Sequence, residues 1–185
     1  VWVETMIYAL IGLALIGLVL VIVIPKISNV EDRILVDQGI ASMNEFDSKI
    51  KAALDWGEGN TRIVDFSIID GELFINSSGD TIVFVLEGLD ESFSESGVPI
   101  KFGEVTVVTL VGEKTSTVYM TLNYSGIVNI TYAGEEETRK FNSASNLFNF
   151  LIRNRGDLDP VSDTNLFVID IVESSSDVFG LGENV

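Results

Sequence analysis

Residues 1–27 read VWVETMIYALIGLALIGLVLVIVIPKI, and this stretch decides the fold. No charged residue lies between Met6 and Ile24, and a helix of that length rises about 28 Å, close to the thickness of a bilayer's hydrocarbon core. No Lys or Arg precedes Lys26, although a membrane helix with its N-terminus inside the cell normally keeps basic residues there. The sequence therefore predicts a membrane-length helix that carries one acid, Glu4, where a basic anchor is usual.

The stretch that follows, residues 25–56, is amphipathic. Its apolar residues recur at spacings of three, four and seven, as on the faces of a helix, and charged residues such as Asp47 fill the opposite face. Two apolar stripes result, one of Ile27, Val30, Ile34 and Ala41, the other of Ile40, Met43, Phe46, Ile50 and Leu54.

One helix from Val1 to Leu54 is therefore expected, ended by the segment Gly57–Asn60. Pro25 removes one intrahelical hydrogen bond, so the helix should bend there. A helix of about 54 residues is about 80 Å long, which is too long for one small domain. Its N-terminal half must project from the rest of the chain.

From Thr61 onward the apolar period changes to two, which is typical of strands. Turns are expected at Asp70-Gly71, Gly79-Asp80, residues 112–114 and Ser125-Gly126, with hairpins between them. Along one strand the inner face should be Val118, Met120, Leu122 and Tyr124.

The region after residue 142 is harder to assign. Residues 143–156 fit either a short helix ending at Gly156 or a loop with inserted apolar residues, and residues 164–174 fit a last strand. About seven strands in an antiparallel, sandwich-like arrangement follow from these assignments. We predict an α+β, lollipop-shaped chain with a helix at 1–56, divided into an apolar half at 1–24 and an amphipathic half at 25–56, and a β-rich head at 57–185.

Composition limits the function. The 185 residues carry 11 Lys and Arg against 28 Asp and Glu, a net charge of −17, most of it in the head. Such a surface repels phosphate backbones, so nucleic acid is not an expected partner. The chain has no Cys and no His, which excludes disulfides, thiolate or His-ligated metal sites and His-dependent catalysis. We predict no catalytic residue, no cofactor and no metal; Asp157, Asp159 and Asp163 do not match the spacing of a Ca²⁺ loop and are expected in a solvated acidic loop.

The missing basic flank has a simple explanation. We expect that a basic leader preceded Val1 and was removed, which leaves Glu4 close to a new α-amino group. A carboxylate among apolar residues is costly unless it is paired or protonated, and that amine is its best available partner, on its own chain or on a neighbour. The alternative is that Glu4 simply lies in the headgroup region of the membrane.

These features resemble a known family. An apolar helix such as residues 1–27, an amphipathic continuation and a β-rich head are similar to mature archaeal type IV pilins. The resemblance implies that a prepilin peptidase cuts before Val1 and that an assembly ATPase and platform build the filament. Helices would bundle in its core, with heads outside. Glu4 resembles the family's single N-terminal acid, although bacterial members place it one position later. Pro25 resembles the proline at which filament helices bend or melt.

The expected function is that of a major structural subunit of an extracellular filament, a homopolymer for adhesion or surface attachment, with a membrane-inserted precursor. The alternative is a single-pass, membrane-anchored, adhesin-like binding domain. A filament used for motility fits the same sequence features as a filament used for adhesion. Gly12 and Gly17 offer spots for close helix contact, although ordinary membrane-helix composition explains them equally well.

Three N-glycosylation sequons occur in the head, at Asn76, Asn123 and Asn129. The alternation along the strands assigns three residues to the outer face: Asn123, Asn129 and Thr131. We predict that at least one of the three carries a glycan.

Overall fold

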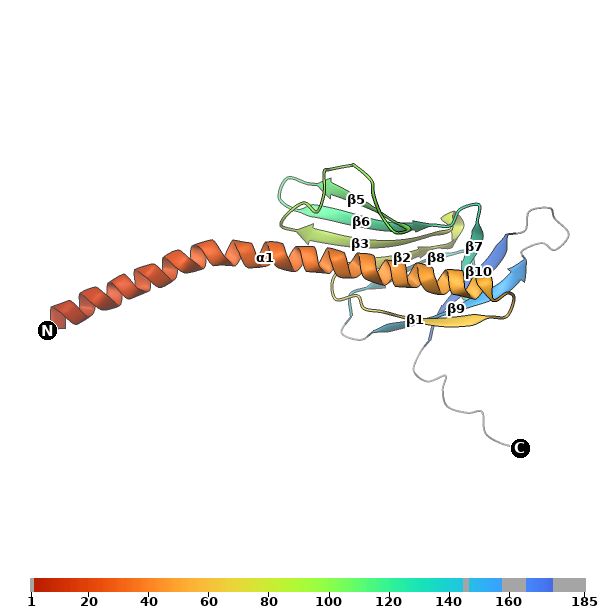
Figure 1. The fold of residues 1–185 in the computed structure, drawn as a ribbon, viewed down its shortest axis with the longest axis horizontal. Coiled ribbons are helices and arrows are strands. Elements are labelled where there is room, and N and C mark those ends of the chain that lie inside the picture. Colours follow the sequence, from red (N-terminus) through yellow and green to blue (C-terminus); the bar gives the residue numbers. More distant parts are fainter. Residues whose placement is uncertain (1, 145–146, 158–165, 175–185) are drawn as a thin grey trace, which may run out of the picture.

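A computed structural model of the chain describes residues 2–144, 147–157 and 166–174, and for residues 23–29 the backbone alone. It shows a long helix, α1 (Trp2–Asp55), followed by two β-sheets (Figure 1). At about 1.5 Å per residue α1 is about 80 Å long, and Figure 1 shows its N-terminal half projecting from the head as a free rod. The predicted α+β class and projecting helix are confirmed.

The helix ends within one residue of the predicted position. The Gly57 N–H donates to the Leu54 carbonyl at 3.1 Å, and Gly57 has a φ of 84°, which favours glycine. The helical backbone continues through Pro25, and Figure 1 shows α1 curving between its free end and the head. Pro25 therefore does not break the helix, and the curvature agrees with the expected bend.

The head contains two sheets, in which every strand pair is antiparallel except β7–β10. A 3₁₀ turn, η1 (Ser77–Gly79), joins β2 to β3. The four-stranded sheet has the order β1 (Thr61–Phe66), β9 (Phe148–Asp157), β10 (Phe167–Glu173), β7 (Val128–Tyr132). The six-stranded sheet has the order β4 (Ile100–Phe102), β5 (Val105–Val111), β6 (Ser116–Asn123), β3 (Thr81–Leu89), β2 (Glu72–Asn76), β8 (Thr138–Asn142).

The core lies where the second half of α1 packs against strands of both sheets. Phe46, with no exposed surface, has its ring centroid 6.2 Å from that of Phe66 on β1 and 5.6 Å from that of Phe150 on β9. Of the two predicted stripes, the one with Phe46 is buried in the head. The other is not, since Val30 and Ile34 stay exposed.

Several strand predictions hold. The β2–β3 hairpin turns at Gly79-Asp80, and the Gly112 N–H closes the β5–β6 turn by donating to the Thr115 carbonyl at 2.9 Å. On β6 the inward residues Val118, Met120 and Leu122 are buried, as the alternation predicts.

Residues 143–156 were wrongly assigned to a helix or a loop. Residues from Phe148 onward form β9, a central strand between β1 and β10. Its buried residues Phe150, Ile152 and Asn154 recur every second position, and the inclusion of a polar Asn hides the period of two. The described residues also hold ten strands rather than about seven, because β4, β8 and β9 were missed.

The expected β1–β2 hairpin is also wrong. The two strands lie in different sheets, β1 beside β9 and β2 beside β3 and β8. Gly71, with a φ of 89°, lies where the chain passes from the four-stranded to the six-stranded sheet. A Cβ at this position would lie 2.3 Å from the Val85 carbonyl oxygen. Similarly, Ser125-Gly126 turns the chain from β6 to β7 in the other sheet.

Candidate assembly surface

The free half of α1 presents a large apolar surface. Residues Trp2–Ile22 form a helix of 21 residues with a mean hydropathy of 2.7, none of it buried, and by length and composition it could cross a membrane. Every large apolar side chain in it is between 50% and 88% exposed. Contiguous exposed apolar patches above a few hundred Å² mark sites of protein or membrane contact. The structure therefore shows an exposed apolar surface suited to a membrane or to packing with other subunits.

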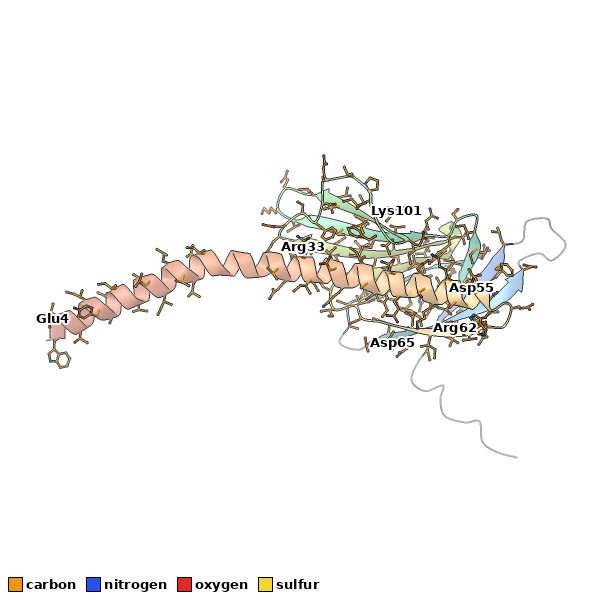
Figure 2. The ribbon with its side chains drawn as sticks, viewed as in Figure 1. Glu4, Arg33, Asp55, Arg62, Asp65 and Lys101 are labelled. Atoms are coloured by element: carbon orange, nitrogen blue, oxygen red, sulfur yellow. The ribbon has the colours of Figure 1, made fainter. Side chains whose placement is uncertain are left out.

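Glu4 lies in the first turn of α1 and is exposed. Figure 2 places it at the free end of the helix, remote from Arg33 and the other labelled charges. A carboxylate in the first turn is favoured because the N-terminal end of the helix dipole is positive. Its expected partner, the α-amino group of Val1, lies outside the described residues.

Gly12 and Gly17 face open space, since a Cβ on either would meet nothing within 4 Å of this chain. Because glycine has no side chain, they form two shallow depressions in the surface of the apolar half, five residues apart. Any close packing at these glycines must come from another molecule. The fifth residue predicted for assembly, Pro25, lies in the helical backbone, and its side chain is outside the description.

The second half of α1 is held in the head by polar contacts as well as by apolar packing. Asp47, predicted on the solvent face, is buried, with 6% of its surface exposed. Its Oδ1 accepts the Tyr124 hydroxyl at 2.9 Å, and its Oδ2 lies 2.9 Å from Lys51 Nζ. Lys51 also reaches Glu104 Oε1 at 3.2 Å. Sequence reasoning missed this cluster because nothing in the spacing of Asp47 shows that Tyr124, 77 residues later, lies above it.

These contacts change the acidity of two groups. Burial, together with the adjacent Asp47 carboxylate, raises the pKa of Tyr124 well above its ordinary value. The hydrogen bond from Lys51 to Asp47 raises the pKa of Lys51, with partial opposition from desolvation. Both shifts favour the protonated forms and keep the cluster intact at neutral pH.

A second link lies at the end of the helix. The fully buried Asn154 of β9 donates from Nδ2 to the Ala53 carbonyl at 3.2 Å, which satisfies one of the last carbonyls of α1. Its Oδ1 accepts the Gly156 N–H at 2.9 Å. The end of α1 is therefore bonded to a central strand, which helps to fix the direction of the whole rod relative to the head.

The three sequons occupy different environments. Asn123 is exposed at the end of β6, and its Oδ1 accepts the Ser125 N–H at 2.9 Å. Asn76 is half-buried and caps η1 by accepting the Gly79 N–H at 3.3 Å. The amide oxygen of Asn129 is buried, with no hydrogen-bond partner among the described residues.

Thr131 was expected on the outer face, but it is buried. Its hydroxyl donates to Asp170 Oδ1 at 3.0 Å. Asp170 also accepts from the Arg155 Nε at 3.0 Å and from the Gly134 N–H at 2.7 Å. The hydroxyl of the Asn129 sequon is therefore part of a closed network in the folded head, whereas Asn123 presents its side chain to solvent.

Among the described residues, no group of three His, Cys, Asp or Glu side chains is arranged to hold a metal ion. Asp157 lies at the end of β9, whereas Asp159 and Asp163 lie outside the described residues. The absence of a catalytic, metal or cofactor site stays a prediction from composition.

Comparison with known proteins gives no further assignment, since no family model, curated protein or solved structure matches the chain.

Proposed function

We propose that this chain is the major structural subunit of an extracellular, archaeal type IV pilus-like filament. Helices of many copies bundle in the core, the acidic heads coat the outside, and the filament serves adhesion or surface attachment. The observation that carries the proposal is a single helix with no buried residue among its first 21 described residues, while its second half forms part of the head's core.

Continuity of the helix favours a filament over a simple anchor. A head that only needs to stay near a membrane can hang from a flexible linker. Here Phe46 is packed against rings of β1 and β9, Asp47 is bonded to Tyr124, and Asn154 is bonded to the last turn of α1. The head is therefore fixed relative to the rod, as a regular helical polymer requires.

Energetics support a durable polymer. Burying about a dozen large apolar side chains, at about 1.5–3 kcal/mol each, stabilises a subunit by about 20–35 kcal/mol relative to exposure in water. The gain relative to lipid is small, because the helix exchanges one apolar environment for another. Extraction from the membrane then needs an energy-coupled assembly machine, and subunits do not dissolve from a finished filament.

The head suits an exposed, non-catalytic coat. Its strong negative charge favours solubility and spacing from similar surfaces. The accessible Asn123 is the best of the three positions for a glycan on the folded head. The chain's lack of His and Cys removes the commonest catalytic groups, so we assign it a structural role.

The alternative, a membrane-anchored adhesin-like domain, draws on the same segment, since 21 helical residues rise about 31 Å and match one bilayer core. Both readings place the precursor in a membrane. They differ in whether the apolar helices later leave the lipid and pack on one another.

Electron microscopy of cell surfaces, and of purified chain after detergent removal, separates the two. We expect helical filaments from the wild type. The Leu13→Glu variant, which puts a charge on the exposed apolar half, should retain a folded head but form no filaments. Membrane-bound monomers of the wild type, with no filaments in either preparation, would contradict the proposal.

A further inference from the structure

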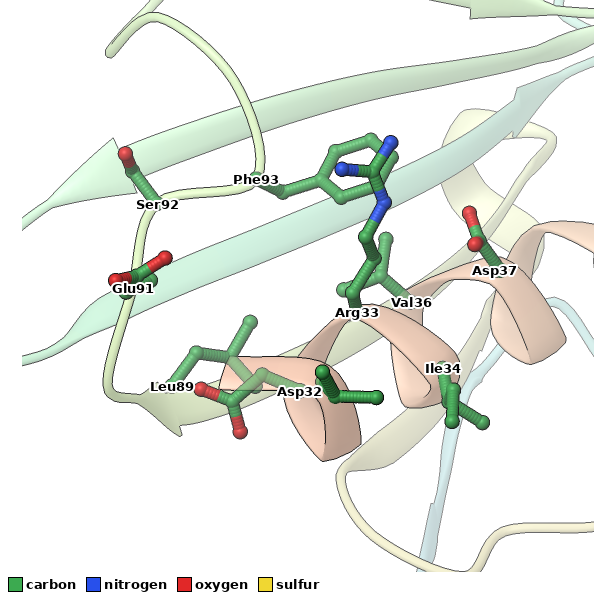
Figure 3. A pocket seen from close by; sticks show the side chains of 10 residues that line it. Asp32, Arg33, Ile34, Val36, Asp37, Leu89, Glu91, Ser92 and Phe93 are labelled. Atoms are coloured by element: carbon green, nitrogen blue, oxygen red, sulfur yellow. The ribbon is translucent and has the colours of Figure 1, made fainter. Parts of the chain in front are cut away.

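The acidity of the chain is unevenly distributed over the head. Carboxylates surround even the hollow beside α1, where Asp32, Asp37 and Glu91 lie around a cavity of about 350 Å³ (Figure 3). The outer face of the six-stranded sheet is different, because threonine, valine and aromatic side chains replace the acids there. This face therefore has another chemistry than the rest of the surface.

One row of outward side chains crosses all six strands of this sheet and holds no acid. The alternate residues point the other way: a Cβ on Gly39 of α1 would meet Phe84 and Met120 within 3 Å, so α1 covers the opposite face. The strand registers align six residues in the outward row: Lys101, Thr106, Thr121, Val83, Phe74 and Lys140. Residues directly opposite each other in such a ladder point to the same side.

We call this surface the threonine face and define it by that row and the two flanking rows, which run through Tyr119 and through Asn123. The flanking rows contain one acid, Glu72, whose Oε1 lies 2.6 Å from Lys140 Nζ. The face thus has no unpaired carboxylate, although the chain has a net charge of −17. Its chemistry suits an uncharged partner with many hydroxyl groups.

Two of the three sequons lie in the same flanking row. Asn123 of β6 and Asn76 of β2 lie opposite Thr81, one on each side of β3. With strands about 4.8 Å apart, the two asparagines are about 10 Å from each other. A sugar joined to either would therefore start at the margin of the threonine face.

The local geometry separates the two asparagines. An N-linked sugar is joined to Nδ2, and Nδ2 of Asn76 lies so close to η1 that a Cβ on Gly79 would be 3.1 Å from it. The hydroxyl of Ser78, which belongs to the same sequon, donates to Asn76 Oδ1 at 2.9 Å. At Asn123 the Ser125 N–H engages the amide oxygen, not Nδ2, and both residues are exposed.

The surroundings of Asn123 continue the contact that a sugar would make. Thr121 and Tyr119 follow it along the outward side of β6, at steps of about 7 Å. Threonine and tyrosine offer hydroxyl groups that donate and accept hydrogen bonds, beside methyl groups and a ring that offer apolar surface. Sugars have the same two properties, in their hydroxyl groups and their C–H faces.

We propose that Asn123 carries an N-linked oligosaccharide of neutral sugars that lies over the threonine face, whereas Asn76 and Asn129 stay unmodified on the folded head. Nδ2 of Asn123 attacks the anomeric carbon of a phosphate-activated oligosaccharide. The new N–C bond replaces the C–O bond to the phosphate, which leaves with the electron pair, and one amide proton passes to a base of the transferase. The inference rests on the proposed function, because it requires the head to lie outside the cell.

Mass spectrometry of glycopeptides from chain isolated from its own cells tests the site. We expect neutral sugar mass on the peptide that contains Asn123 and none at Asn76 or Asn129. Two matched variants change only the sequon hydroxyl: Ser125→Ala should abolish the modification, and Ser125→Thr should keep it. An unmodified Asn123 in the wild type, a glycan at Asn76 or Asn129, or acidic sugars would overturn the proposal.

Tyrosine nitration of subunits in detergent tests whether the glycan covers the face. Tyr119 should react several-fold more slowly, relative to Tyr132 of the other sheet, in the wild type and in Ser125→Thr than in Ser125→Ala. Equal rates in the three chains would overturn the coverage. Protection of Tyr119 that arises only in filaments, and equally in both variants, would assign the face to contact between copies and overturn it as well.

The two proposals fail in different ways. Wild-type filaments with an unmodified Asn123 would overturn this inference and leave the proposed function standing. A glycan on Asn123 of a chain that stays a membrane-bound monomer would support the inference and contradict the filament.

Discussion

The two halves of α1 contain similar apolar residues but have opposite environments. From Trp2 to Ile22 every large apolar side chain is at least half exposed, whereas Met43, Phe46 and Ile50 have no exposed surface. The first half is apolar on all sides, and the second is apolar on the side that meets the sheets. A helix that is apolar on every side cannot be covered by one head, so the first half stays exposed, whereas the second half completes the core of the head.

This contrast separates folding from assembly within one helix. Changes in the second half should alter the stability of the head, and changes in the first half should alter assembly and leave the head intact. Unfolding of the full chain in detergent measures the former, and filament yield measures the latter.

The largest effect on the head is expected from Phe46→Ala. Loss of a fully buried aromatic ring that contacts Phe66 and Phe150 leaves a cavity, and such changes cost about 3–5 kcal/mol of unfolding free energy. Denaturant titration followed by circular dichroism checks it. The matched change in the first half, Leu13→Ala, should shift the unfolding of the head by less than about 0.5 kcal/mol. Equal losses in the two variants would remove the distinction between the halves.

The next effect concerns the buried contact between α1 and β6. Tyr124→Phe removes a hydrogen bond to the buried Asp47 carboxylate, and bonds to charged groups contribute about 1.5–3 kcal/mol. Because the pKa of Tyr124 is raised in the folded head, its contribution is complete below the unfolded tyrosine pKa of about 10 and is lost as the pH rises further.

Unfolding free energies measured at pH 8 and pH 11 test whether the stability of the head falls as the pH rises. The wild type should lose stability between these values, and Tyr124→Phe should lose less. Some loss should remain, because the pKa of Lys51 is raised as well and acts in the same direction. A variant that loses as much stability as the wild type would show that Tyr124 does not cause the alkaline loss.

A small effect is expected on the solvent side of the same helical half. Lys49 Nζ lies 3.9 Å from Glu45 Oε1, and both side chains are more than one-third exposed. Lys49→Ala should therefore change the unfolding free energy by less than about 0.5 kcal/mol, and less still at high salt. A loss above about 1 kcal/mol would mean that this side of α1 is covered by something other than water.

The smallest effect on the head is expected from Glu4→Ala, which lies at the free end of the rod. Unfolding of the head should be unchanged, while filament yield falls much more than protein level, because a carboxylate in an apolar bundle must act as a paired group. Glu45→Ala, which removes an exposed acid from the second half, serves as the control and should keep its yield. Normal filaments from Glu4→Ala would show that Glu4 has no part in assembly.

The helix could be predicted from the sequence because its signals are local. The apolar run, the change of period and the Gly57 stop can all be identified within a few turns. The alternation on β6 and the turns at Gly79-Asp80 and residues 112–114 are local signals of the same kind. The exposure of the apolar half followed from the length of the helix, which is too long for one small domain.

Pairing between distant strands could not be predicted in this way. β1 finds its partner in β9, across 86 residues from Val64 to Phe150, and no turn signal encodes that choice. The same holds for Asp47, whose burial depends on Tyr124, and for Asp170, whose burial depends on Arg155 and Thr131. A charged residue in a polar stripe is expected in solvent until its long-range partner is known.

The passage of α1 through the core of the head has a mechanical consequence. In the proposed filament, a stretching force enters each subunit along the axis of its helix. Since Phe46 is packed against rings of β1 and β9 and the Ala53 carbonyl is bonded to Asn154, this tension acts as shear over several helical turns at once. Contacts loaded in parallel share the force, whereas contacts at a hinge would break one at a time. The head is thus joined to its rod by contacts that share a pull along the helix.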